Sequence, residues 1–156
     1  MIAGLTLHNV YQMGFVVRDV DLAMDHFRRR FGVEKFRIAR HSPDIATAHA
    51  YVGEMMLELV QVSTNGPEYF VPYIPQEPHI AKFHHHAYRI YNDEDWNALS
   101  TAIKSSGLTY YEGKRGGGMS VFFVDLREET GLYAEYVYLK GDALTYYDTV
   151  PRNDLS

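Results

Sequence analysis

Residues Tyr11–Arg18 have the sequence YQMGFVVR, and residues Phe83–Ile90 have the sequence FHHHAYRI. Both runs are rich in aliphatic or aromatic residues, which is typical of β-strands. When the two runs are aligned, Gln12 matches His85, and a small residue follows two positions later in each run. The match indicates that the chain contains the same structural module twice.

A second pair of runs supports the duplication. Residues 56–60 have the sequence MLELV and residues 133–137 have the sequence YAEYV, so Glu58 and Glu135 fall at the same place in each half. Agreement in both pairs of runs, in element order and in the glycine that ends each helix is stronger than any one short match. We therefore expect one module in each half of the chain.

The first half is predicted to have the element order β-α-β-β-β. Its helix should begin at Asp19 or Asp21, which are suitable N-cap residues, and end at Gly32. The apolar face of this helix is expected to comprise Leu22, Met24, Phe27 and Phe31. Strands are expected at residues 11–18, 35–40, 45–52 and 55–62, with Gly53–Glu54 as a tight turn between the last two.

The second half is predicted to repeat this order. Strands are expected at residues 84–91, 108–112, 119–126 and 132–139, and a helix at residues 94–106 ended by Gly107. Between the halves, four prolines and an Asn-Gly pair interrupt regular structure. The sequence predicts a single α+β domain over residues 1–156, with module one at 11–62, a connection at 63–82, module two at 84–139 and a C-terminal arm at 140–156.

Composition limits the classes of function. The chain has 156 residues, of which 46% are hydrophobic, and this is enough for one domain with its own core. A net charge of −5 disfavours nucleic acid and anionic membranes as partners, and no apolar run reaches the roughly 20 residues of a membrane span. The absence of cysteine means that any metal must be bound by histidine, carboxylate or amide groups. These features are compatible with a cytoplasmic location, and they leave a homodimer open.

Four polar side chains are expected to lie on the concave side of the sheets, because side chains alternate between the two faces of a strand. A carboxylate within an apolar run such as MLELV is costly to bury unless it is paired, protonated or bound to a cation. One divalent metal shared by Gln12, Glu58, His85 and Glu135 accounts for both carboxylates. Such an oxygen and nitrogen set suits Zn, Ni, Co, Mn or Mg. The alternatives are a hydrogen-bonded core histidine and carboxylates on a solvated face.

Four segments carry a family resemblance: LHNVYQMGFVVRDVDLAMDHF (7–27), MLELVQV (56–62), FHHHAYRI (83–90) and GLYAEYVYL (131–139). They resemble the ligand-bearing segments of the vicinal-oxygen-chelate superfamily. The candidate ligand set resembles that of zinc-type glyoxalase I, and the HH-x-A and LELVQ segments also resemble methylmalonyl-CoA epimerase. The resemblance implies two tandem βαβββ modules that form a curved mixed sheet around a central metal-binding cavity.

The resemblance also implies an activity. In these families the metal binds vicinal oxygens of the substrate and a glutamate at the metal site moves a proton, so we expect a metal-dependent lyase or isomerase. The base would be Glu58 or Glu135, and the metal would stabilise an enediolate. The epimerases usually have histidine where Gln12 stands, and no glutathione-binding segment is identified, so the substrate is not carried over. A single histidine at the matching positions disfavours the iron site of extradiol dioxygenases.

Two other classes of function stay open. A binding or resistance protein would sequester an aromatic small molecule without turnover, and the 13 tyrosines and 8 phenylalanines fit such a cavity. Proteins resembling bleomycin-resistance proteins generally lack the four ligands, so their presence here favours an enzyme. A metal enzyme of ring or C–C bond chemistry is the third class.

Some residues outside the ligand set are also candidates for function. Arg89 shares the expected cavity face and is predicted to bind a carboxylate or phosphate of the substrate, with a salt bridge at the sheet rim as the alternative. Tyr133 is the second candidate for contact with the small-molecule substrate. His8 is expected to be a surface residue. The run GKRGGG at residues 113–118 lacks the spacing of a phosphate-binding loop and is expected to be a flexible loop, with a lid role open to it if it is mobile.

Overall fold

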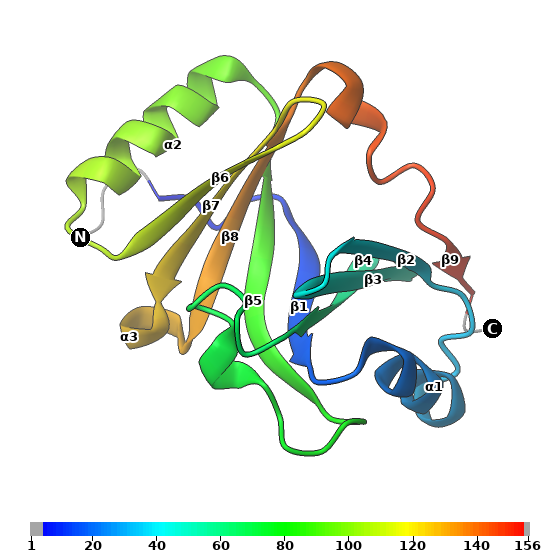
Figure 1. Ribbon diagram of the computed structural model, residues 1–156. Coiled ribbons are helices and arrows are strands. Elements are labelled where there is room, and N and C mark those ends of the chain that lie inside the picture. Colours follow the sequence, from blue (N-terminus) through cyan, green and yellow to red (C-terminus); the bar gives the residue numbers. More distant parts are fainter. Residues whose placement is uncertain (1–4, 155–156) are drawn as a thin grey trace. The chain divides into compact units, whose positions relative to one another are not determined.

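The computed structural model describes residues 5–154, which contain helices and strands in two compact units (Figure 1). The first unit comprises Gln12–His84 together with residues 149–154, and the second unit comprises residues 5–11 together with His85–Asp148. Each unit repeats the element order predicted from the sequence. The α+β class and the two βαβββ modules are therefore confirmed.

In the first unit a helix accompanies a mixed sheet. Strands β4 and β1 are parallel, while β3 is antiparallel to β4 and to β2, which gives the order β2-β3-β4-β1. A short strand near the C-terminus, β9, pairs parallel with β3. The elements are β1 (Val10–Val17), α1 (Val20–Phe31), β2 (Arg37–Ser42), β3 (Ile45–Val52), β4 (Met55–Val62), the 3-10 helix η1 (Val71–Tyr73) and β9 (Arg152–Asn153).

The second unit has the same arrangement. Its strand order is β5-β8-β7-β6, with β5 parallel to β8 and the other pairs antiparallel. The elements are β5 (Ala81–Ile90), α2 (Asp93–Ser105), β6 (Tyr110–Arg115), β7 (Met119–Leu126), α3 (Arg127–Thr130), β8 (Leu132–Leu139) and the 3-10 helix η2 (Gly141–Thr145). In both units the first and last strands of the module are therefore parallel neighbours.

Helix α1 begins and ends where capping chemistry predicts. The Asp19 side chain accepts a 3.0 Å hydrogen bond from the backbone N–H of Leu22, and Gly32 ends the helix with a positive φ of 69°. The predicted apolar face is wrong at two positions, because Leu22 and Phe31 are exposed. The helix instead buries Val20, Ala23 and Met24 against β3 and β4.

The sheet faces that pack on the helices form the cores of the units. In the second unit Tyr88, Ile90 and Tyr136 pack with Leu99 and Ile103 of α2. Burial raises the pKa of Tyr136, whose hydroxyl donates to the carbonyl of Thr6. The opposite faces of the same strands hold the buried polar side chains described below. Alternation along each strand thus separates core from candidate site.

Several predicted element boundaries differ from the structure. Strand β2 begins at Arg37 rather than residue 35, and β5 begins at Ala81, within the predicted connection. Strand β6 extends to Arg115, so the first half of the GKRGGG run is strand rather than loop. The turn that follows is held in place, because the carbonyls of Gly117 and Gly118 accept hydrogen bonds from the backbone N–H groups of Ala143 and Lys140. The expectation of a loop is therefore wrong for residues 113–115, and the lid role stays a prediction.

Each end of the described chain belongs to the unit that contains the module farther away in the sequence. Residues 5–11, which lead into strand β1 of the first module, belong to the second unit, and the carbonyl of Thr6 accepts the hydrogen bond from Tyr136. Residues 149–154, which follow the second module, belong to the first unit. There the buried Asn153 side chain accepts from the N–H of Lys35 and donates to the carbonyls of Lys35 and Tyr51.

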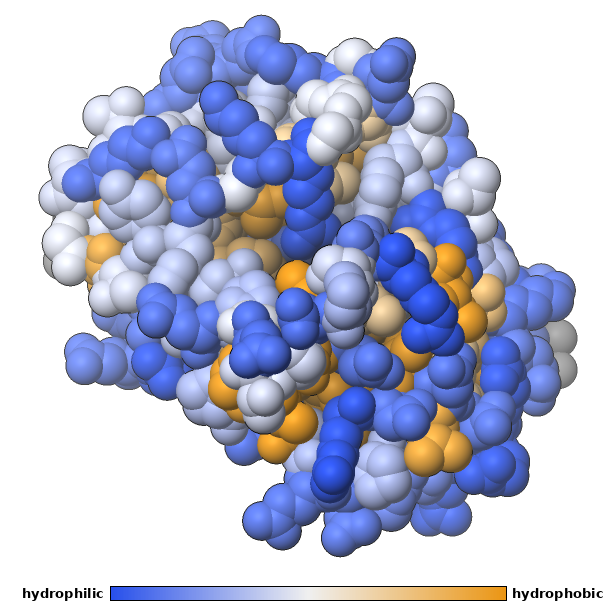
Figure 2. Space-filling model, viewed as in Figure 1, coloured by the Kyte–Doolittle hydropathy of each residue, from blue (hydrophilic) through white to orange (hydrophobic). Residues whose placement is uncertain are grey.

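The surface on the face shown in Figure 2 is mostly hydrophilic, with hydrophobic residues emerging in separate groups. The exposed large hydrophobic residues include Phe31 of α1 and Tyr91 after β5. Within residues 5–154, no helix has both the length and the apolar character that crossing a membrane requires.

Candidate metal centre

In the first unit, Gln12 and Glu58 are brought together by the parallel pairing of β1 with β4. Gly14 is the register partner of Glu58, and Gln12 precedes it by two residues on the same face. The Gln12 Nε2 donates a 3.0 Å hydrogen bond to Oε2 of Glu58. Both side chains are buried, with exposed fractions of 1% for Gln12 and 6% for Glu58.

In the second unit, His85 and Glu135 are brought together in the same way. Ala87 is the register partner of Glu135 in the parallel pair of β5 and β8, and His85 precedes it by two residues. His85 Nε2 lies 3.4 Å from Glu135 Oε2. Both side chains are buried, and the His85 ring packs nearly perpendicular to the Phe123 ring of β7, with 5.1 Å between the centroids.

The small residue opposite each glutamate has a structural reason. Parallel neighbours on one face lie close enough that a bulky side chain at the register position would fill the space of the carboxylate. Gly14 and Ala87 leave that space open, so each glutamate reaches diagonally to the polar residue two positions earlier. The duplicated pattern that was seen in the sequence thus corresponds to a duplicated local geometry.

His49 is a further polar residue of the first unit, and the sequence analysis missed it. It lies on β3 directly opposite Glu58 in the antiparallel pair with β4, and its Nε2 is 3.1 Å from Glu58 Oε1. Only 2% of its surface is exposed. The available signal was a single histidine in the otherwise small and apolar run IATAHAYV, opposite Glu58 across the Gly53–Glu54 turn.

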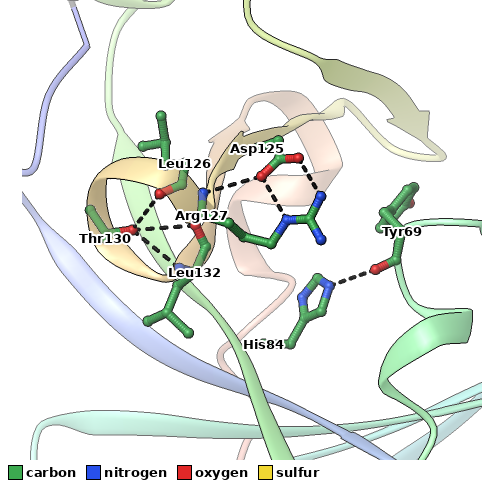
Figure 3. A network of polar contacts seen from close by, with 7 residues as sticks. All are labelled: Tyr69, His84, Asp125, Leu126, Arg127, Thr130 and Leu132. Carbon is green, nitrogen blue, oxygen red and sulfur yellow. Dashed lines mark hydrogen bonds and ion pairs between the residues drawn. The ribbon is translucent and has the colours of Figure 1, made fainter.

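The neighbours of His85 on β5 have different surroundings. His84 is buried on the other face, where its Nε2 lies 2.8 Å from the carbonyl oxygen of Tyr69 (Figure 3). Its ring also packs against Phe70 and Tyr73. Burial lowers the pKa of His86, and the nearby His85 lowers it further. His84 and His85 are thus both fully buried, on opposite faces of β5.

The two candidate substrate-binding residues lie in the second unit. The Arg89 guanidinium stands over the rings of Tyr91 and Tyr147, at 5.5 and 5.9 Å from their centroids. Tyr133 is buried beside His85 in register. The guanidinium of Arg127 lies 5.0 Å from the Tyr133 ring centroid, and it forms a two-pronged ion pair with Asp125 (Figure 3). The roles of Arg89 and Tyr133 remain predictions.

The donor chemistry of the two pairs fits a divalent metal. A buried carboxylate is costly unless it is hydrogen-bonded or paired with a cation, and Glu58 and Glu135 are both buried within reach of Gln12 and His85 respectively. Glutamine oxygen, carboxylate oxygen and imidazole nitrogen are all ligands for Zn and for the neighbouring divalent ions. The residues present are therefore compatible with such an ion.

The family is established by comparison with known proteins. A family model described as the Glyoxalase/Bleomycin resistance protein/Dioxygenase superfamily matches residues 11–123, most of the chain. The chain belongs to this superfamily. The match begins one residue before Gln12 and includes Glu58 and His85, and the predicted resemblance to vicinal-oxygen-chelate proteins is thereby confirmed.

Solved structures of other proteins share the fold. A Streptomyces coelicolor methylmalonyl-CoA epimerase in complex with 2-nitronate-propionyl-CoA is 15% identical, with a TM-score of 0.62 over 88% of this chain and 98% of that chain. The Mycobacterium tuberculosis methylmalonyl-CoA epimerase is 13% identical, with a TM-score of 0.63 over 92% and 98% of the two chains. A hypothetical protein from Bacillus halodurans is 20% identical, with a TM-score of 0.57 over 85% and 94%. No curated protein matches the chain by sequence.

Proposed function

We propose that this superfamily member is a metal-dependent lyase or isomerase that removes the proton next to a carbonyl group of a small molecule. The observation that carries the proposal is the repeated pairing of a buried glutamate with a polar residue of the neighbouring parallel strand, Gln12 with Glu58 and His85 with Glu135. A fold alone hosts many activities, so the argument depends on these four side chains.

The proposed ligands of one divalent ion are Gln12, Glu58, His85 and Glu135. Zn, Ni, Co, Mn and Mg are the candidate ions, because the donors are oxygen and nitrogen and no thiolate is present in the chain. When bound, such an ion supplies positive charge that polarises a carbonyl and stabilises the negative charge that develops when the neighbouring proton leaves.

Glu58 and Glu135 are the two candidates for the proposed base. Glu58 has a hydrogen-bonding partner at each carboxylate oxygen, Gln12 at Oε2 and His49 at Oε1, and Oε2 of Glu135 lies 3.4 Å from Nε2 of His85. The glutamate that acts as the base would have to give up such a contact to reach the substrate. It would take the proton from carbon and return it, either to the same carbon or to its neighbour.

The proposed substrate class is a carbonyl compound with a second oxygen close to the carbonyl. Structural relatives include a methylmalonyl-CoA epimerase solved with methylmalonyl-CoA, so an acidic acyl thioester is the first compound to test. Arg89 is proposed to attract its carboxylate, as a guanidinium forms paired hydrogen bonds with such a group. Tyr133 would contact the same substrate beside His85.

Exchange of the carbon-bound proton with solvent deuterium tests this function. Methylmalonyl-CoA and a panel of α-hydroxy-carbonyl compounds would be incubated with the protein in deuterium oxide and followed by NMR. We expect exchange with at least one compound, its loss after treatment with a chelator, and its return when metal is added. Glu58→Gln and Glu135→Gln should each abolish the exchange while leaving the protein folded, because the amide has nearly the volume of the carboxylate but lacks the charge that accepts a proton or binds the ion.

The alternative of a binding protein predicts a different outcome. Such a protein would bind compounds of the panel tightly, with full metal content, and would catalyse no exchange or product formation with any of them. That result would contradict the proposed enzyme.

A further inference from the structure

Glu58 is held from two strands at once. On one side β1 places Gln12 against Oε2, and on the other side β3 places His49 against Oε1. The two bonds come from the two strands that flank β4, and both polar groups lie on the same face of the sheet as Glu58. The carboxylate is therefore fixed in orientation by the sheet itself.

The position of His49 leaves its side chain little freedom. It is the register partner of Glu58 in the antiparallel pair of β3 and β4. This strand pairing is the longest in the first unit and continues without a bulge from Ile45 and Val62 to the turn. Its neighbours Ala48 and Ala50 are fully buried, and His49 itself is 2% exposed. A polar side chain so enclosed keeps its hydrogen bond, because water cannot easily replace its partner.

The two hydrogen bonds also determine which atoms remain to bind a cation. With Nε2 of Gln12 donating to Glu58, the amide oxygen is the atom of Gln12 suited to metal coordination. An ionised Glu58 accepts hydrogen bonds only, so the Nε2 of His49 must carry a hydrogen and donate it. Each carboxylate oxygen has a further lone pair, and the carboxylate can therefore accept from His49 and bind a cation together.

We propose that His49 is a positioning residue that orients Glu58 for the divalent ion, an inference that rests on the proposed function. It acts through its bond to Glu58 and not as a ligand. Groups that hydrogen-bond to metal ligands typically change metal affinity by ~10- to 100-fold when they are removed. His49 also ties β3, which carries none of the four proposed ligands, to the metal centre.

Cobalt(II) binding to the purified full chain tests the role of His49. The ion reports both its affinity, by calorimetry, and its coordination, by its visible absorption. His49→Leu removes the donor at similar bulk, while His49→Gln keeps an N–H group. Thr47→Val is the matched control, because Thr47 is buried on the same face of β3 two residues away and bonds to His41 rather than Glu58.

The expected cobalt affinities distinguish H49L from the other three proteins. We expect the original chain and T47V to bind one cobalt ion equally, H49L to bind ~10- to 100-fold more weakly, and H49Q to stay within about fivefold of the original. The cobalt spectrum of H49Q should match the original, since the ligands are unchanged. Circular dichroism would confirm that each variant is folded without metal.

Three outcomes overturn the inference in distinguishable ways. Equal cobalt affinity of H49L and the original chain would remove the positioning role alone. Equal weakening of H49L and H49Q, with a changed spectrum, would make His49 a ligand. If the original chain binds no cobalt, zinc or nickel stoichiometrically, the proposed function fails, and the role of His49 at a metal centre fails with it.

Discussion

Gly118 is required by the backbone at the turn between β6 and β7. Its φ is 105°, and a Cβ added there would collide with the carbonyl oxygen of Lys140. We predict that Gly118→Ala destabilises the protein by about 1–3 kcal/mol, since both strain and a steric clash with backbone oppose it. Urea unfolding followed by circular dichroism would measure the difference.

Gly116 is the control for this prediction, because it lies in the same turn with no positive φ and with no atom near the position of an added Cβ. Gly116→Ala should change the free energy of unfolding by less than about 0.5 kcal/mol. Equal effects of the two substitutions would contradict the explanation given for Gly118.

At the residue scale, the sequence predicted those site residues whose positions follow from the alternation of side chains along a single strand. Gln12, Glu58, His85 and Glu135 stood out as polar residues inside apolar strands, and the structure places all four in buried pairs. His49 was missed because its importance depends on the register between β3 and β4, which brings it opposite Glu58. Register is a tertiary property that no single run of sequence contains.

At the element scale, the C-terminal segment joins the first unit through the pairing of β9 with β3 and through the Asn153 side chain. Asn153 is buried and makes three hydrogen bonds to the backbone of Lys35 and Tyr51. We predict that Asn153→Ala lowers the free energy of unfolding by ~1–3 kcal/mol, because the backbone groups lose their partner. Urea unfolding tests this, and Asn153→Asp, which replaces the donating Nδ2 by an oxygen that faces the carbonyls of Lys35 and Tyr51, should cost at least as much as Asn153→Ala.

Helix α2 carries a pH-dependent contact near its start. The pKa of Asp93 is lowered mainly by the hydrogen bond from the Tyr138 hydroxyl and further by the charge of Lys140. A lowered folded-state pKa stabilises the protein above the unfolded value, near 3.8, and this stabilisation is lost as pH falls through the folded-state pKa.

Tyr138→Phe removes the hydroxyl that lowers the pKa of Asp93. We therefore predict that it reduces stability more at pH 6 than at pH 3, as judged from urea midpoints at the two values. An equal loss at both pH values would show that the hydroxyl acts independently of the charge on Asp93.

The sequence predicted the bounds of the long apolar strands correctly and those of the edge strands and the two-residue strand poorly. Strands β3, β4, β7 and β8 have the predicted bounds, because they are long apolar runs ended by turn residues. Strands β2 and β6 begin later than predicted, since edge strands have mixed polarity and little pattern. Strand β9 was not predicted at all, because two residues carry no periodicity and depend on pairing with β3.

At the scale of the whole molecule, the duplication gives the two units corresponding parts. Each unit provides a βαβββ module and a buried pair of polar residues, and each unit also includes one terminal segment of the other half. Binding of a divalent ion by the four proposed ligands should stabilise the folded chain. At a free metal concentration of 100 times the dissociation constant, the expected gain is about 2.7 kcal/mol.

The most direct test of the central claim is anomalous diffraction from crystals of the protein grown with zinc or cobalt. We predict a single strong anomalous peak per chain, bound by side-chain oxygens of Gln12, Glu58 and Glu135 and by a ring nitrogen of His85, at roughly 2.0–2.2 Å from each. His49 should lie outside bonding distance of the peak and against Glu58. A peak at other residues, or no peak at saturating metal, would contradict the proposed metal centre.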